Sequence, residues 1–320
     1  MDLDEQLAKY LTDAFSIELQ ALAQLRTAPD LAGAPVLADA FRAHLEETEG
    51  HRDTVGALLE ARGASPSKTK NAVMAAGGKG FVWFARVQPD TPVKLFAHAL
   101  SYEALELASY ELLLRVARRA GDERAETAAA GIRDQERRMM DRLEAHVDAA
   151  VEAALAGRSP DDVRALLARY LADAHALEEQ AVTLLEHATE LVADPIQAVF
   201  ADHLTETYEH RELVAARLEA LGSGPSALKD AMLRLGAVGW STFFEHHPDT
   251  PGKLAAFAYA FEHLEIGAYE QLALVAKRAG DAETAGVASA VLEQERQAAS
   301  QVAGIFDAAV TASLQAVGAS

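Results

Sequence analysis

Apolar residues recur with the 3.6-residue period of an amphipathic helix along four long stretches in the first half of the chain. These stretches predict helices at residues 3–27, 35–62, 92–120 and 122–156. Their composition is rich in Ala, Leu, Glu and Arg, which are good helix formers, and no strand pattern competes with the helical one. The second connection, from Gly63 to Pro92, is long and predicts a short helix at about Thr69–Phe84. Four long helices with one long crossover favour a four-helix bundle.

The second half of the chain repeats the first. The segment YLTDAFSIELQA at Tyr10 recurs as YLADAHALEEQA at Tyr170, and HLEETEGHR, PDTPVKL and ARRAGD recur in order as HLTETYEHR, PDTPGKL and AKRAGD. Such order indicates a tandem duplication. We therefore expect an all-α protein of two domains, residues 1–157 and 160–320, separated near a helix stop at Gly157 and a helix start at Ser159-Pro160. We also expect the two bundles to pack about a pseudo-twofold axis, as an intramolecular pseudo-dimer.

Charge and composition narrow the class of protein. Among 320 residues, 49 are acidic and 29 basic, which gives a formal net charge of −20. This balance argues against nucleic acid and anionic membranes as partners, since both need a basic surface. The start of the chain lacks a signal peptide pattern and no apolar run is long enough to span a membrane, so we expect a cytoplasmic protein. Without Cys, a metal would need Glu, Asp or His as ligands.

Several acidic residues fall on the apolar faces of the predicted helices. Glu18 interrupts the apolar seam of the first helix and Glu136 that of the fourth, and the second copy repeats both positions as Glu178 and Glu295. An unpaired carboxylate at a core position would be costly. These positions therefore need a partner that neutralises them.

The two middle helices carry further candidates. The second predicted helix has His44, Glu47 and His51 on one face, and the third has Glu103 and Glu106 one turn apart, followed by Tyr110. The second copy keeps all six residues, as His203, Glu206, His210, Glu262, Glu265 and Tyr269.

A single Glu-x-x-Glu pair on an Ala-rich helix is usually solvated, and a single His is more often a hydrogen-bonded core or surface residue. The conjunction on four helices, in both copies, instead favours a site for two metal ions, because divalent cations would neutralise the converging carboxylates. A carboxylate-rich set with few imidazoles suits iron or manganese better than zinc.

At these residues the chain resembles the ferritin-like superfamily, and within it the bacterial YciE/YciF-like stress proteins. The resemblance rests on the YLxDAxxxExQA start, the HLxET stretch, EHLEIGAYEQL from Glu262 and the AxRAGD turn, which together cover most of both copies. It implies a di-iron-type centre in each bundle. By position it implies these carboxylate ligands: Glu18, Glu47, Glu103, Glu106 and Glu136 in the first copy, and Glu178, Glu206, Glu262, Glu265 and Glu295 in the second.

The chain departs from the common ferritin-like Glu-x-x-His pattern, because Gly50 and Glu209 stand where the imidazole is expected. His51 and His210 lie one residue later, and His44 and His203 compete with them for the ligand role. In the second copy His175, one turn before Glu178, replaces Phe15 and offers an additional nitrogen ligand.

Three functions are compatible with these features. The first is an oxidoreductase that oxidises Fe(II) or consumes peroxide or dioxygen in stress defence, which the resemblance favours. The second is an enzyme that activates dioxygen toward an organic substrate, with the aromatic residues Phe81, Trp83 and Phe84, and in the second copy Trp240, Phe243 and Phe244, as a pocket wall. The third is a helical scaffold whose sites have decayed. Tyr110 and Tyr269 are candidate catalytic residues, although ordinary core packing explains them equally well.

Overall fold

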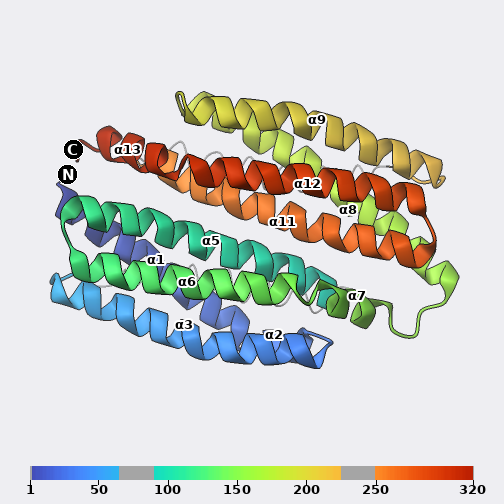
Figure 1. Ribbon diagram of the computed structural model, residues 1–320, viewed down its shortest axis with the longest axis horizontal. Helices are drawn as coiled ribbons and strands as arrows, with labels where there is room; N and C mark the ends of the chain where they lie inside the picture. The colour runs from blue at the N-terminus through green and yellow to red at the C-terminus, as the bar shows by residue number, and fades with distance from the viewer. Residues whose placement is uncertain (1, 65–89, 225–248, 320) are drawn as a thin grey trace. The chain divides into compact units, whose positions relative to one another are not determined.

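The computed structural model describes residues 2–64, 90–224 and 249–319, and every regular element within these ranges is a helix (Figure 1). The chain divides into two compact units, Met1–Ala154 with Leu314–Ser320, and Leu155–Ser313. The prediction of an all-α protein made of two helical bundles is therefore confirmed. The short helix expected at Thr69–Phe84 and the two aromatic clusters lie outside the described residues.

The described part of unit 1 contains four long helices, α1 (Leu3–Leu25), α3 (Pro35–Ala61), α5 (Thr91–Ala120) and α6 (Glu123–Glu144). Helix α1 packs against α3 and α5, and α6 packs against α5 and α3, so the four surround one core. Two short helices follow α1 and α6, namely α2 (Ala28–Leu31) and α7 (Val147–Leu155).

Unit 2 has the same arrangement. Its long helices are α8 (Pro160–Leu191), α9 (Ile196–Ala220), α11 (Thr250–Ala279) and α12 (Ala282–Gly304), and α13 (Phe306–Ala316) follows α12. Helix α8 packs against α9 and α11, and α12 packs against α11 and α9.

The repeated RAGD turn joins the third and fourth long helices of each unit. Gly121 ends α5 with φ of 68°, a left-handed conformation that glycine adopts without strain. The next residue, Asp122, starts α6 by accepting a hydrogen bond from the backbone N–H of Ala125 (2.8 Å), and its carboxylate also pairs with Arg62 at the end of α3. One short motif thus ends a helix, starts the next and ties the turn to a third.

Two predicted helices differ from the structure. The stretch 122–156 is not one helix, because the chain tightens after α6: the N–H of His146 bonds to the carbonyl of Leu143 (2.8 Å) instead of the carbonyl four residues back. The first helix ends at Leu25 rather than residue 27, and Pro29 opens the separate turn α2. Its counterpart α8 instead continues as a single helix to Leu191.

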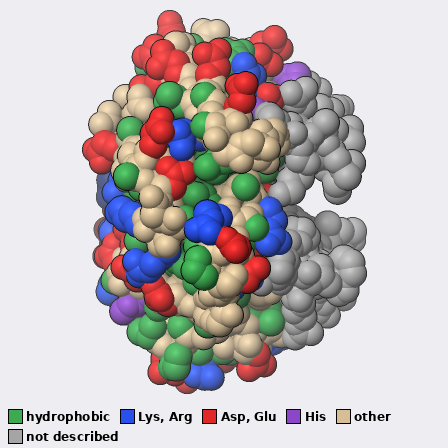
Figure 2. All heavy atoms as spheres, turned by 90° about the vertical axis from the view of Figure 1, so that its right-hand side faces the viewer, with side chains coloured by type: hydrophobic (Ala, Val, Ile, Leu, Met, Phe, Trp, Pro, Cys, Tyr) green, Lys and Arg blue, Asp and Glu red, His purple; other side chains and the backbone are tan. Residues whose placement is uncertain are grey.

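The described helices include none that is both long and apolar enough to cross a membrane. Figure 2 shows one face of the surface, on which acidic and basic side chains are intermingled. The acidic residues considered next are buried instead.

Candidate metal centre

All four long helices of unit 1 direct a carboxylate or an imidazole into the middle of the bundle. The residues are at most 3% exposed, and they come from α1 (Glu18), α3 (His44 and His51), α5 (Glu103 and Glu106) and α6 (Glu136). They form two groups whose potential ligand atoms lie within 4.8 Å of one another: His44, Glu103, Glu106 and Glu136 make the first group, and Glu18, His51 and Glu136 make the second.

Glu136 belongs to both groups, and each of its oxygens faces a different histidine. Its Oε2 lies 3.2 Å from Nε2 of His44, and its Oε1 lies 2.9 Å from Nδ1 of His51. The His44 Nε2 atom is also 2.9 Å from Oε2 of Glu103, and the His51 Nδ1 atom is 3.7 Å from Oε2 of Glu18. A carboxylate between two such groups has the geometry of a bridge between two cations.

Unit 2 repeats this arrangement with nearly the same distances. Glu295 Oε1 lies 2.8 Å from Nδ1 of His210, and its Oε2 lies 3.5 Å from Nε2 of His203. Nε2 of His203 is 2.9 Å from Oε2 of Glu262. The corresponding groups are His203, Glu262, Glu265 and Glu295, and Glu178, His210 and Glu295.

The nitrogen of each imidazole that points away from the group is held by a neighbouring side chain. Nε2 of His51 lies 3.0 Å from Oε1 of Gln135, and Nδ1 of His44 lies 3.0 Å from Oε2 of Glu47. Such contacts fix the tautomer and orientation of a ligating imidazole. Sequence reasoning missed Gln135 and its counterpart Gln294, although both precede the seam glutamate in the repeated DQER and EQER segments.

Glu47 and Glu206, which the resemblance implies as ligands, lie outside both groups. The Glu47 side chain is 26% exposed and also accepts a hydrogen bond from Nη2 of Arg142 (2.8 Å), while that of Glu206 is 38% exposed. The hydrogen bond with His44 and the charge of Arg142 lower the pKa of Glu47 to about 2. Glu47 thus contacts His44 at Nδ1, the imidazole nitrogen that points away from the group.

His175 also lies outside both groups of unit 2, although it is buried on α8 one turn before Glu178. The structure therefore does not bring it to the cluster as an additional ligand. By contrast, both histidines of each competing pair, His44 with His51 and His203 with His210, lie within a group.

The two candidate catalytic tyrosines contact the clusters directly. The Tyr110 hydroxyl donates a short hydrogen bond to Oε1 of Glu18, and Tyr269 donates to Oε1 of Glu178 in the same way. Both tyrosines are at most 1% exposed. Each hydroxyl occupies one oxygen of its glutamate and orients the other toward the histidine.

In the absence of a cation, protons balance the charge of the cluster: burial lowers the pKa of His44 and of His51, but the facing carboxylates outweigh it and raise both. Burial raises the pKa of Glu18 to about 8 and that of Glu103 to about 7, and it raises the pKa of Glu106 well above its usual value. Burial acts on Glu136 in the same direction, but the facing His44 and His51 outweigh it and lower its pKa to about 2. The carboxylates thus ionise together only if positive charge enters the site.

The oxygens of Glu106 show this most directly. Among the described residues, neither of them has a hydrogen-bond partner, and the same holds for Glu265 in unit 2. Buried carboxylate oxygens are ordinarily hydrogen-bonded, because leaving them unpaired is costly. Such unsatisfied oxygens, aimed at an imidazole and further carboxylates, fit a bound cation.

Fold and site together define the class: a protein of two helical bundles, each with a buried Glu/His cluster able to hold metal ions. The family described as "Domain of unknown function (DUF892)" matches twice, over residues 2–156 and 162–315. The chain therefore belongs to the DUF892 family and carries its domain in duplicate. The comparison with solved structures found no significant match.

Proposed function

We propose that each unit is a ferritin-like carboxylate bundle that binds two divalent metal ions, with iron as the first choice and manganese as the second. The observation that carries the proposal is the pair of buried groups that share Glu136 in unit 1 and Glu295 in unit 2. If each group held one ion, the shared glutamate would lie between the two ions of the unit.

Charge balance supports two ions per unit. The two groups of unit 1 contain four carboxylates, Glu18, Glu103, Glu106 and Glu136, and two imidazoles that ligate in the neutral form. Four ionised carboxylates carry −4, and two divalent ions carry +4. The buried site is then neutral without extra protons, which removes the electrostatic cause of the raised carboxyl pKa values.

The donor set supports iron or manganese. Each group combines a single imidazole with carboxylates, whereas structural zinc sites are usually tetrahedral with sulfur and nitrogen ligands, and the chain has no Cys. Gln135 and Glu47 would hold the two imidazoles in their ligating tautomers, and Tyr110 would hold Glu18.

For the activity, we propose oxidation of Fe(II) as a substrate, or consumption of peroxide or dioxygen, in stress defence. A redox-active metal pair would supply the electron transfer to the oxidant. The surrounding helices would keep bulk water away from the buried cluster. The carboxylates would favour the higher oxidation state of the metal through their negative charge. The stress role rests on the YciE/YciF-like resemblance.

Two alternatives remain distinct from this proposal. An enzyme that activates dioxygen toward an organic substrate needs an apolar pocket beside the cluster, and unit 2 has such a pocket next to Glu262. A scaffold with decayed sites would bind no metal.

We also propose domain boundaries at 1–157 and 160–320, within which both matched segments fall, and packing of the two units as an intramolecular pseudo-dimer. Small-angle X-ray scattering tests the packing, because a profile of two separated bodies would contradict it.

The experiment that tests the metal site is elemental analysis of the purified chain before and after anaerobic loading with Fe(II), with Mn(II) and Zn(II) in parallel. We expect roughly four ions per chain, two for each bundle, with Fe(II) or Mn(II) retained through desalting. A loaded chain that retains less than about half an ion would exclude the metal site and leave the scaffold. Oxygen and peroxide electrodes then measure whether the loaded chain consumes either oxidant.

A further inference from the structure

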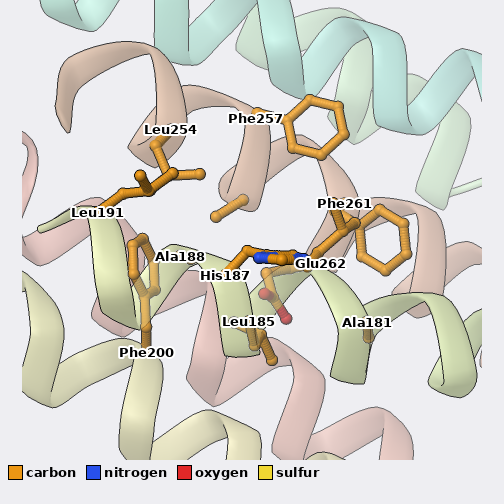
Figure 3. A pocket seen from close by; sticks show the side chains of 12 residues that line it. Ala181, Leu185, His187, Ala188, Leu191, Phe200, Leu254, Phe257, Phe261 and Glu262 are labelled. Carbon is orange, nitrogen blue, oxygen red and sulfur yellow. The ribbon is translucent and has the colours of Figure 1, made fainter. Parts of the chain in front are cut away.

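Unit 2 contains a pocket that begins at its cluster. It lies between α8, α9 and α11 (Figure 3). Twelve residues line it, and ten of them are hydrophobic; the other two are His187 and Glu262. Glu262 belongs to the first group of unit 2, where its Oε2 lies 2.9 Å from His203. The pocket therefore reaches a candidate metal ligand.

Large apolar side chains form the walls of this pocket. In Figure 3, Leu191, Leu254 and Phe200 stand on one side, and Phe257 and Phe261 stand on the other. The two phenylalanine rings are tilted, with centroids 6.3 Å apart. Half-buried residues, among them Leu184, His187 and Phe257, complete the lining.

Unit 1 has a pocket at the equivalent place, which also reaches a cluster glutamate, Glu103. Two of its lining residues are polar where unit 2 has hydrocarbon: Gln24 replaces Leu184, and His98 replaces Phe257. Their side chains bond to each other, with Nε2 of His98 3.0 Å from Oε1 of Gln24.

A third replacement also makes the pocket of unit 1 more polar than that of unit 2. Tyr102 stands where unit 2 has Phe261, and its hydroxyl donates to the carbonyl of Ile17 on α1 (3.0 Å). Polar bonds thus cross the unit 1 pocket from α5 to α1, and none of these three polar side chains exists in unit 2.

We propose that unit 2, and not unit 1, binds a small uncharged apolar organic molecule in this pocket, with one end beside Glu262. A charged molecule would lose its hydration among the ten hydrophobic residues, and Glu262 would repel an anion. The placement beside a metal rests on the proposed function, but the binding of the molecule does not.

This assignment distinguishes the two copies by function. If both clusters hold metal, only the centre of unit 2 has a hydrocarbon-lined site for an organic molecule beside it, whereas hydrogen bonds of His98 and Tyr102 cross the equivalent site of unit 1. The duplication would then have produced one substrate-binding bundle and one without a substrate pocket.

The test is titration of the metal-depleted full-length chain with toluene, followed by NMR of its Leu and Val methyl groups. Saturable shifts are expected at Leu185, Leu191 and Leu254 of unit 2, and not at Leu25 or Leu95, which line the equivalent pocket of unit 1. The unit 1 methyls thus serve as the control within the same molecule. Equal shifts in both units, or none in unit 2, would overturn the proposal.

Two reciprocal variants test the cause. Exchanging the pair of unit 2 for that of unit 1, as L184Q/F257H, is expected to weaken toluene binding by at least about tenfold, because it places polar groups in the pocket wall. The converse variant, Q24L/H98F, is expected to give unit 1 a saturable site. Unchanged binding in L184Q/F257H, with the unit 1 methyl spectrum intact, contradicts the proposal. Repeating the titration after loading with diamagnetic Zn(II) shows whether binding depends on the metal, so a failure of the metal site and a failure of the pocket are measured separately.

Discussion

Replacement of the shared glutamate is the most informative single change in the candidate centre. Among the described residues of unit 1, Glu136 alone belongs to both groups, whereas Glu18 and Glu106 each belong to one. We predict that Glu136→Gln removes both ions from unit 1, so that the chain binds about two ions instead of four. Glu18→Gln and Glu106→Gln should each remove about one.

The magnitude follows from the charges. Two unit charges about 4 Å apart interact with about 4 kcal/mol at an effective dielectric constant of 20, and a bridging carboxylate faces two divalent ions. For a divalent ion the same calculation gives about 8 kcal/mol, so that a loss of even half of this energy per ion corresponds to about a thousandfold in Kd. The second group would also retain only two donors, Glu18 and His51.

The assay is elemental analysis after anaerobic Fe(II) loading and desalting, with circular dichroism to establish that the variant is folded. Glu47→Gln is the matched control, because Glu47 bonds to His44 from outside the groups; it should keep all the ions and lose affinity only modestly. If Glu136→Gln loses no more metal than Glu18→Gln does, Glu136 is not shared by the two ions. Glu295→Gln should have the same effect on unit 2.

Three further predictions concern unit 1. Tyr110→Phe removes the hydroxyl that donates to buried Glu18, and it should lower the free energy of unfolding by about 1–3 kcal/mol, as measured by urea denaturation. Burial lowers the pKa of His98 to about 3, below its unfolded value of 6.5. Between these two pH values the unfolded chain binds a proton that the folded chain does not, so the free energy of unfolding falls as the pH drops. His98→Phe should remove a slope of up to about 1.4 kcal/mol per pH unit, and identical slopes for the two proteins would contradict this prediction. Gly121→Ala should destabilise the folded chain by about 1–2 kcal/mol, because φ of Gly121 is 68°. Gly131→Ala inside α6 should instead stabilise it by up to about 1 kcal/mol, because nothing lies within 4 Å of the added Cβ. Thermal unfolding measures both changes.

Helix geometry explains which features of the site the sequence could predict. Seven residues make nearly two helical turns, so His44 and His51 point within about 20° of each other and both reach the cluster. Glu47 is three residues from His44, about 60° to one side, while Thr48 and Val55 mark the buried seam on the other side. The spacing of the residues places Glu47 on the same face of α3 as the two histidines, but it does not predict that Glu47 lies at the edge of this face, outside the groups.

Other features depend on contacts that no single helix pattern contains. The break between α6 and α7 leaves the apolar period nearly intact, since α7 continues to bury Ala150 and Val151. The contact between Gln135 and His51 joins residues 84 positions apart on two helices. Only the recurrence of the Gln beside the seam glutamate in both copies signalled it.

The duplication provides a comparison that a single domain would lack. The cluster residues are repeated without exception, from Glu18 and Glu178 to Glu136 and Glu295, although a buried set of four carboxylates per unit is unfavourable for folding alone. The neighbouring pocket instead changes in chemical character, from the bonded pair Gln24 and His98 to hydrocarbon in unit 2. Packing alone would let both regions vary, because a Glu/His cluster can be replaced by apolar residues of similar volume. Metal ions in both clusters, together with an organic molecule beside the cluster of unit 2 alone, would account for both observations.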